Sequence, residues 1–338
     1  MIVLYILLAL VILLVMVTIH EFGHYIAGKM LGFKINEFSI GFGPALFSKT
    51  NKKNGEKFSV RAIPLGGYCA FDGEETDTET ETSFMKQKPW KRLIVLFFGA
   101  FFNFLSAIIF SFILLVSVGY DIPKITNITE VNGKTQQYLQ VGDIITHVDG
   151  TKISYINGNN FTDLLAKYKA GESAKIVVVR DGETKEIDLQ FFNDTDNSVK
   201  VGINMTSVPY SFGEALLKCI PFTFVMGWQI LVMFWHFLTG RLALSNLGGP
   251  ITTIRTMATL SMQGASNILV LLPLLATNLA IFNWLPIPAL DGSKMVFTTV
   301  EWIRGKPINP KVENRIHTIG LIVLFAIVII ADFYHLIF

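Results

Sequence analysis

Two histidines and a glutamate stand close together near the N-terminus, in the order His20-Glu21-Phe22-Gly23-His24. On a helix, residues four apart leave the same face one turn apart, so both imidazoles can bind one metal ion. Glu21 is placed to take a proton from a water molecule at that metal, as the glutamate of HExxH sequences does. The spacing therefore predicts half of a catalytic zinc site on one helix.

The residues before this motif, 1–19, carry no charge. An uncharged run of this length can cross the hydrocarbon core of a membrane, so the motif is expected inside a membrane helix. Ionisable side chains at membrane depth are costly and are taken as functional by default. The alternative is a helix end whose histidines lie near the lipid headgroups.

The composition indicates an integral membrane protein. Of the 338 residues, 51% are hydrophobic and only 16% are charged, which excludes an ordinary soluble domain. The first apolar run has no Lys or Arg ahead of its core and no small-residue cleavage pattern, so we expect a retained helix. Four transmembrane helices are expected, at 1–31, 92–120, 264–292 and 316–337. The apolar region 212–255 is expected to form a membrane-surface or re-entrant helix with a linker.

The distribution of charge predicts the topology. Residues 29–92 hold eleven Lys and Arg and residues 294–315 hold five, whereas both chain ends have none. By the positive-inside rule these two stretches are cytoplasmic, the second within a loop expected at 293–315, and both termini lie outside. The net charge of +2, without a basic stripe, makes nucleic acid an unexpected partner. Cys69 and Cys219 would lie at different depths, so no disulfide is predicted.

Residues 32–91 are expected to form short β-hairpins and an acidic loop on the cytoplasmic side. Apolar positions alternate there, and turn signals occur at Gly41-Phe42-Gly43-Pro44 and at 64–67. The acidic, Thr-rich segment 73–83 is typical of a solvated, mobile loop.

A polar region at 122–207 has a different pattern. The run LQVGDIITHVDG at 139–150 and a predicted hairpin at 175–180 and 184–189 resemble the PDZ domain family. This resemblance implies a β-rich α/β domain that binds the C-terminus of a peptide by strand addition. The alternative is a small β-rich domain that binds no ligand and acts only as a size filter.

A third metal ligand is expected at Asp291, because catalytic zinc usually takes three protein ligands. Asp291 is the only acid between Glu214 and Glu301 and follows 35 uncharged residues. A carboxylate at that depth needs a cation, which a metal held by two histidines would supply. Pro286 and Pro288 are expected to break the helix just before it.

HExxH in the first membrane helix, a PDZ-like middle region and NxxPxPxLDG near the end of the third helix together resemble the site-two protease family. The bacterial branch that includes the regulator of sigma-E protease is the most similar. The resemblance covers the whole chain and implies one zinc ion on His20, His24 and Asp291, with Glu21 as the catalytic base. It also implies that the hairpins at 33–71 dip into the membrane beside the site. The resemblance further implies six substrate-binding residues: Asn278, Asn283, Pro286, Pro288, Gly41 and Gly43.

Two departures from the family pattern are visible. Members commonly carry GPxxN in the second helix, whereas residues 99–103 read GAFFN. Losing that proline is expected to leave the helix straighter, and the loss itself is expected to touch no metal ligand. The second departure is a single PDZ-like unit where some relatives carry two. Asn246-Leu247-Gly248-Gly249-Pro250 resembles the family's region downstream of the PDZ domain, or is an ordinary loop.

The resemblance implies an intramembrane zinc endopeptidase of the bacterial inner membrane, with its active site toward the cytoplasm and the PDZ domain outside. Expected substrates are single-span proteins such as anti-sigma factors already trimmed outside, or remnant signal peptides. One alternative is a transporter that uses His20, Glu21 and Asp291 as a cation path, but no repeated halves are evident. Another is an inactive scaffold that recruits partners through its PDZ domain. Asn278 could equally serve helix packing, whereas a functional role is favoured for Asn283.

Overall fold

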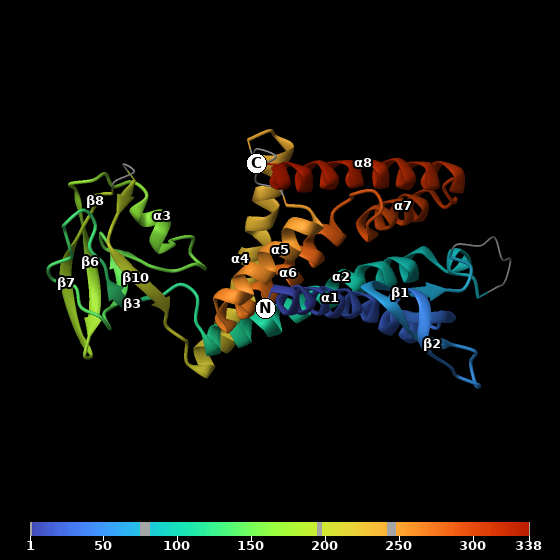
Figure 1. Ribbon diagram of the computed structural model, residues 1–338. Helices are drawn as coiled ribbons and strands as arrows, with labels where there is room; N and C mark the ends of the chain where they lie inside the picture. Colours follow the sequence, from blue (N-terminus) through green and yellow to red (C-terminus); the bar gives the residue numbers. More distant parts are fainter. Residues whose placement is uncertain (1, 75–81, 195–197, 242–247, 338) are drawn as a thin grey trace. The chain divides into compact units, whose positions relative to one another are not determined.

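The computed structural model describes residues 2–74, 82–194, 198–241 and 248–337, which fold as two compact units. The first unit comprises residues 1–110 and 226–338, and the second comprises residues 111–225 (Figure 1). Most of the expected acidic loop, at 75–81, lies outside the described residues, as do Asn246 and Leu247.

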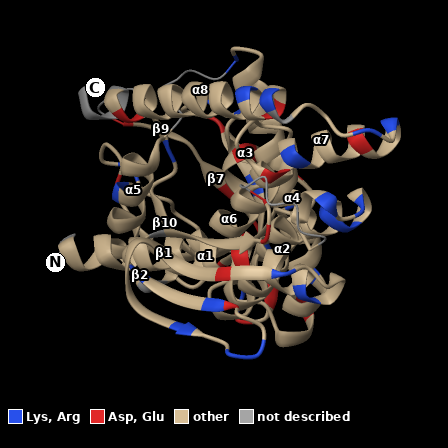
Figure 2. Ribbon diagram, turned by 90° about the vertical axis from the view of Figure 1, so that its right-hand side faces the viewer, with Lys and Arg blue, Asp and Glu red and all other residues tan. Residues whose placement is uncertain are grey.

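Among the described residues, five helices are long and apolar enough to cross a membrane, which indicates a multi-pass membrane protein. They are α1 (Ile2–Leu31), α2 (Pro89–Ser117), α4 (Phe212–Leu238), α6 (Ala265–Trp284) and α8 (Pro310–Ile337). The expected number of four is therefore not confirmed. The fifth candidate is α4, which runs continuously through Pro221 and is not broken as a re-entrant segment would be. Charged residues of α8 gather near its start, apart from Asp332 (Figure 2).

The directions of three helices follow from their contacts. His24 of α1 lies beside Val95 of α2, whereas the earlier His20 lies beside the later Asn103. The two helices are therefore antiparallel. Residues 9–16 of α1 share a hydrophobic cluster with 271–276 of α6, while His20 lies with the later Asn283. We conclude that α1 and α6 run in the same direction.

A long, folded hairpin follows α1. Strands β1 (Ile35–Thr50) and β2 (Lys57–Phe71) each bend, so that residues 37–40 pair both with 57–60 and with 67–70, while 45–50 pair with 57–61. The bend in β1 uses Gly41 and Gly43, whose φ values of +85° and +81° favour glycine. The expected hairpins are thus one hairpin folded into a small sheet, and β2 packs beside α1 (Figure 1).

The segment around Asp291 differs from the expected single helix at 264–292. Helix α6 ends at Trp284, a non-helical turn holds Pro286 and Pro288, and α7 (Asp291–Arg304) begins at the aspartate itself. The two prolines explain the break, because neither can donate a helical hydrogen bond. The expected loop at 293–315 contains most of α7 and the start of α8, which begins earlier than the expected 316.

A short helix, α5 (Pro250–Gln263), follows the Gly248-Gly249 pair. Its first backbone amides, on Ile251 and Thr252, donate to the Asp332 carboxylate of α8 at 3.1 and 2.9 Å. A side chain on Gly249 would overlap that carboxylate. A small 3₁₀ turn, η1 (Phe84–Lys86), precedes α2.

The second unit holds a six-stranded antiparallel sheet in the order β10-β3-β4-β6-β7, with β5 paired to β4. Its core includes Ile145, Ile176, Val178 and Leu189. The elements are β3 (Pro123–Ile128), β4 (Ile144–Val148), β5 (Thr151–Lys152), α3 (Phe161–Leu165), β6 (Ser173–Arg180), β7 (Glu183–Gln190), β8 (Phe192–Asn193), β9 (Val199–Lys200) and β10 (Ile203–Ser207). This sheet occupies the region of the expected PDZ domain, and its membership of that family stays a prediction.

Candidate metal site

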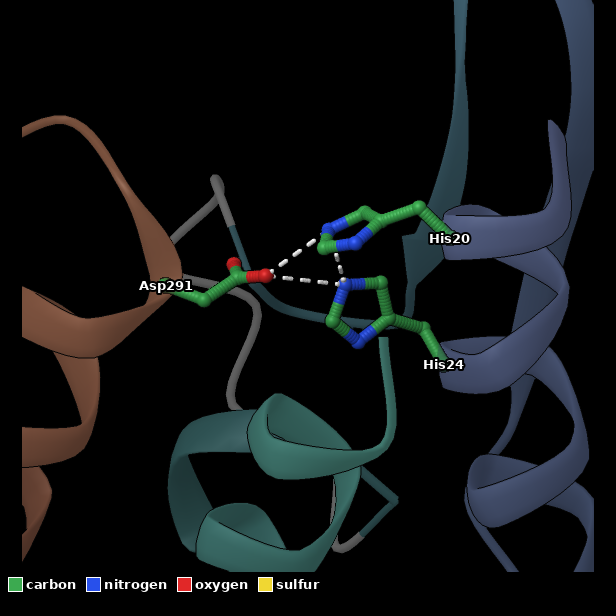
Figure 3. A group of neighbouring side chains, drawn as sticks. All are labelled: His20, His24 and Asp291. Carbon is green, nitrogen blue, oxygen red and sulfur yellow. Dashed lines mark hydrogen bonds and ion pairs between the residues drawn. The ribbon is translucent and has the colours of Figure 1, made fainter. Parts of the chain in front are cut away.

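His20, His24 and Asp291 meet in the first unit (Figure 3). Asp291 Oδ2 lies 2.9 Å from His20 Nε2 and 3.2 Å from His24 Nε2, and the two Nε2 atoms are 3.2 Å apart. Both histidines are buried. Three residues from two distant parts of the sequence therefore present one nitrogen or oxygen atom each to the same point.

Helix α2 orients both imidazoles. The Nδ1 atom of His24 lies 2.8 Å from the carbonyl oxygen of Val95, which can only accept, so Nδ1 carries the proton. Its Nε2 therefore has a free lone pair directed at His20 and Asp291. On the other ring, Nδ1 of His20 lies 3.3 Å from the side-chain amide of Asn103.

Asn103 is fully buried, and its Oδ1 atom has no hydrogen-bond partner among the described residues. A half-turn of the amide places that oxygen at His20 Nδ1, where it accepts the ring proton. The second ring then also directs an unprotonated Nε2 toward Asp291. In this arrangement both imidazoles are in the form that binds a metal.

The donor set fits zinc. Two imidazole nitrogens and one carboxylate oxygen are the three-ligand combination of many catalytic zinc sites, which keep a fourth position for water or substrate. Without a cation, two lone pairs and a carboxylate would face one another in a buried place, which is unfavourable. The residues therefore fit one bound zinc ion.

Two glycines permit the close packing of α1 on α2. A side chain on Gly99 would overlap Nε2 of His24, and one on Gly23 would overlap the carbonyl oxygen of Phe98. The loss of the family's proline from the GAFFN segment was expected to touch no metal ligand, and this stays a prediction. Gly99 and Asn103 of the same segment lie against the two histidines, and neither was named as a site residue from the sequence. The likeness of this segment to the family's GPxxN pattern was the sequence signal that could have indicated its place beside the histidines.

Glu21 lies beside the metal-binding atoms and is held by the hairpin. Its Oε2 accepts a hydrogen bond of 3.1 Å from the backbone N–H of Cys69. Glu21 and both histidines line a cavity of about 650 Å³, together with Tyr68 and Lys294 among others. Among the described residues, the part of the sheet nearest the glutamate is thus the end of β2 rather than Gly41 and Gly43.

The six residues expected to bind substrate lie in different places. Asn283 lines a smaller cavity with His20, Glu21 and Asp291, and its Nδ2 donates to the carbonyl oxygen of Leu279 at 2.9 Å. Asn278, Pro286, Pro288, Gly41 and Gly43 line neither of the two cavities beside the metal-binding atoms. The prolines shape the turn before Asp291, and the glycines shape the bend of β1.

The fold and the site define a multi-pass membrane protein with a candidate metal site between its helices. Residues 8–327 match peptidase family M50, and the chain belongs to this family. It is similar to proteins named as zinc metalloproteases from Fusobacterium nucleatum, 33% identical with 94% of each chain covered, and from Clostridium perfringens, 28% identical with 99% of each covered. It is also similar to a chloroplastic membrane metalloprotease of Arabidopsis thaliana, 29% identical, covering 93% of this chain and 76% of the relative.

These similarities identify the activity class. The chain is a membrane zinc metalloprotease of family M50. Of the functions considered from sequence, the transporter and the inactive scaffold are therefore set aside.

Proposed function

We propose that this protein is an intramembrane zinc endopeptidase that cuts single-span membrane proteins. His20, His24 and Asp291 hold one zinc ion, and Glu21 is the catalytic base. The observation that carries the proposal is the convergence of three ligand atoms within 3.2 Å of one another on and beside a membrane helix, next to a glutamate.

When bound, zinc activates a water molecule for attack and polarises the scissile carbonyl. Glu21 accepts the proton of the attacking water and later gives it to the leaving amine. The Cys69 N–H holds one oxygen of the Glu21 carboxylate in place, and Glu21 lines the cavity beside the metal-binding atoms. Asn283, at the wall of the smaller cavity, is placed to donate a hydrogen bond to the substrate carbonyl.

A transmembrane helix must be unwound before it is cut, because its carbonyls are bonded within the helix. The last residues of β2, 67–71, pair with β1 on one side only, and the N–H of Cys69 on the other side points at Glu21. We place the unwound substrate along this edge, where it adds as a strand. This edge belongs to the same folded hairpin as Gly41 and Gly43, which the family resemblance implies for substrate binding.

The helix directions support a four-span topology. If α1 crosses inward and α2 crosses outward, then α6 crosses inward again, in the same direction as α1. A complete crossing by α4 between them would make α6 run in the opposite direction to α1. We therefore assign α4 to the outer membrane surface, where its exposed Trp228 and Trp235 suit the interface. Both termini and the β-rich unit then lie outside, and the metal site lies toward the cytoplasmic side of a bacterial inner membrane.

The β-rich unit offers a groove of about 730 Å³ between α3 and the edge strand β10, lined by Phe161, Leu165 and Ile203 among others. Such a groove suits the C-terminus of a peptide added to β10. We propose that it either binds such an end or excludes substrates with large outer domains. Substrates are then anti-sigma factors after a first outer cut, or remnant signal peptides.

A cleavage assay with purified protein in detergent tests this function. The substrate is a single-span protein, with or without a folded outer domain, and zinc is removed by a chelator and then restored. We expect a cut inside the membrane segment of the short form only, lost without zinc and regained with it. Cleavage that is indifferent to zinc, or confined to residues outside the membrane segment, would contradict the proposal.

Topology is tested in intact cells by labelling with a thiol reagent that does not cross the membrane. Thr184→Cys places an exposed thiol on β7, and Lys52→Cys places one in the β1–β2 turn, while the native Cys69 and Cys219 are buried. We expect labelling of the first variant and not of the second. The reverse pattern would overturn the orientation.

A further inference from the structure

Helix α8 touches the turn that carries Asp291 at two residues on one of its faces. The backbone N–H of Ala289 donates to Nδ1 of His317 at 3.2 Å. One turn later, a side chain on Gly320 would overlap the ring of Pro288. The turn before the metal-binding aspartate is therefore fitted against α8 by a hydrogen bond and by close packing.

This turn has an unusual backbone that needs such support. Ala289 has a φ of +75°, a left-handed conformation that is uncommon for a residue with a side chain. Residues held in this region persist where the surroundings fix them, and they cluster at functional sites. Two residues later comes Asp291, so the conformation of Ala289 decides where its carboxylate points.

The tautomer of His317 follows from its partner. An amide N–H can only donate, so Nδ1 of His317 carries a lone pair and the ring proton lies on Nε2. Nε2 is buried, has no hydrogen-bond partner among the described residues, and faces Glu313 Oε1 at 3.9 Å. Glu313 is one turn earlier on α8 and favours a proton on that nitrogen. The ring also packs against Phe297, with 5.4 Å between ring centroids.

Ser293 completes the contact. Its hydroxyl donates to the carbonyl oxygen of Leu290 at 2.8 Å and lies 3.4 Å from Nδ1 of His317. The imidazole therefore meets Ala289, two residues before Asp291, and Ser293, two residues after it. Among the described contacts of the ring, none is to the aspartate itself.

We propose that His317 is a positioning residue for the metal site. Its Nδ1 holds the Ala289 N–H and thereby fixes the left-handed turn that brings the Asp291 carboxylate to His20 and His24. The inference rests on the proposed function, in which Asp291 is a zinc ligand. It assigns to α8, which supplies none of the three metal-binding atoms, a direct effect on zinc affinity.

Two nearly isosteric substitutions separate the hydrogen bond from packing. In His317→Asn the side-chain oxygen stands close to the place of Nδ1 and can accept from Ala289, whereas His317→Leu has the same shape without an acceptor. Removing a group that hydrogen-bonds a metal ligand typically weakens metal affinity by about 10–100-fold. His317 acts one bond further out, through the backbone of Ala289, so a loss at the lower end, about 10-fold, is expected. We expect this loss in the Leu variant and an affinity near that of the wild type in the Asn variant.

The measurement is zinc affinity, by competition with a chelator, on the purified full-length protein in detergent. Thr318→Ala serves as the control on α8, because among the described residues the Thr318 hydroxyl bonds only the carbonyl oxygen of Asn314 in the same helix. Its zinc affinity should equal that of the wild type. Thermal unfolding of the zinc-free proteins shows whether each variant is folded, and His317→Phe provides a second variant without an acceptor should the Leu variant fail to fold.

Equal zinc affinities for the Asn and Leu variants, whether both weakened or both unchanged, would overturn the role of His317. Failure of the proposed function has a different signature, since the wild type itself would then bind no zinc, or would bind it as well after Asp291→Asn. The two outcomes are read from the same titrations.

Discussion

The side-chain amide of Asn103 lies 3.3 Å from Nδ1 of His20, while Nε2 of the same ring faces Asp291 at 2.9 Å. In the same way, the carbonyl oxygen of Val95 lies 2.8 Å from Nδ1 of His24, while Nε2 of that ring faces Asp291 at 3.2 Å. Helix α2 therefore sets the rotation and the tautomer of both histidines, although it contributes none of the three metal-binding atoms. Removing such partners typically costs about 10–100-fold in metal affinity or activity.

Asn103→Ala should weaken zinc binding by about 10–100-fold, because the His20 ring loses the group that fixes its proton on Nδ1. Asn103→Asp keeps an oxygen at that place and should retain most of the affinity. Thr18→Ala is the control on α1, because in the described part of the chain the Thr18 hydroxyl bonds only the carbonyl oxygen of Leu14. Chelator competition measures all three, and an Ala variant as tight as the wild type would contradict this role.

Gly99→Ala should abolish zinc binding and cleavage while the protein still inserts in the membrane. The added methyl group would overlap the metal-binding nitrogen of His24 and touch the His20 ring, so the helices must separate or the rings must turn away. Gly213→Ala adds the same methyl group in α4, where no atom of the described residues lies within 4 Å, and should have no effect. Metal content per purified chain decides the matter, and full zinc occupancy in the Gly99 variant would refute the packing described.

The hairpin beside the site should loosen in acid. Burial alone would raise the pKa of Glu37, but hydrogen bonds from Ser59 and Arg61 outweigh it and lower the pKa to about 2, against an ordinary value of 4.5. Because the folded pKa is the lower one, the stabilisation is complete above about pH 4.5 and is lost as the pH falls toward 2.

Hydrogen exchange of peptides from β1 and β2, corrected for the intrinsic effect of pH, measures this loss. Protection should fall between about pH 4.5 and 2 in the wild type. In Glu37→Gln protection should be lower at neutral pH and nearly independent of pH. Parallel profiles for the two proteins would show that Glu37 does not hold the hairpin.

The three metal-binding residues could be predicted from the sequence because each of them has a local sequence signal. The four-residue spacing of His20 and His24 predicts that they share one helix face. Asp291 is the single acidic residue at the end of a long uncharged stretch. The positions of Asn103 and His317 depend on how α2 and α8 pack, which no spacing along the chain expresses. Both were therefore missed as contacts of the site.

The fold was predictable to a similar extent. Apolar length predicted the long helices, and glycine and proline predicted the bends of the hairpin. The double pairing of residues 37–40 was not foreseen, because register depends on both neighbours of a strand. The start of α7 at Asp291 was also missed, since apolar length alone does not separate a membrane helix from the short helix that follows its end.

The most direct test of the account is a paired measurement on Glu21→Gln in the purified protein. Zinc content and cleavage of the single-span substrate are determined on the same sample. Because Glu21 is placed as the base and not as a ligand, the variant should retain one zinc per chain and lose cleavage by at least about 100-fold. Undiminished cleavage by the Glu21→Gln protein would contradict the proposed mechanism, and a wild-type protein without zinc would contradict the site.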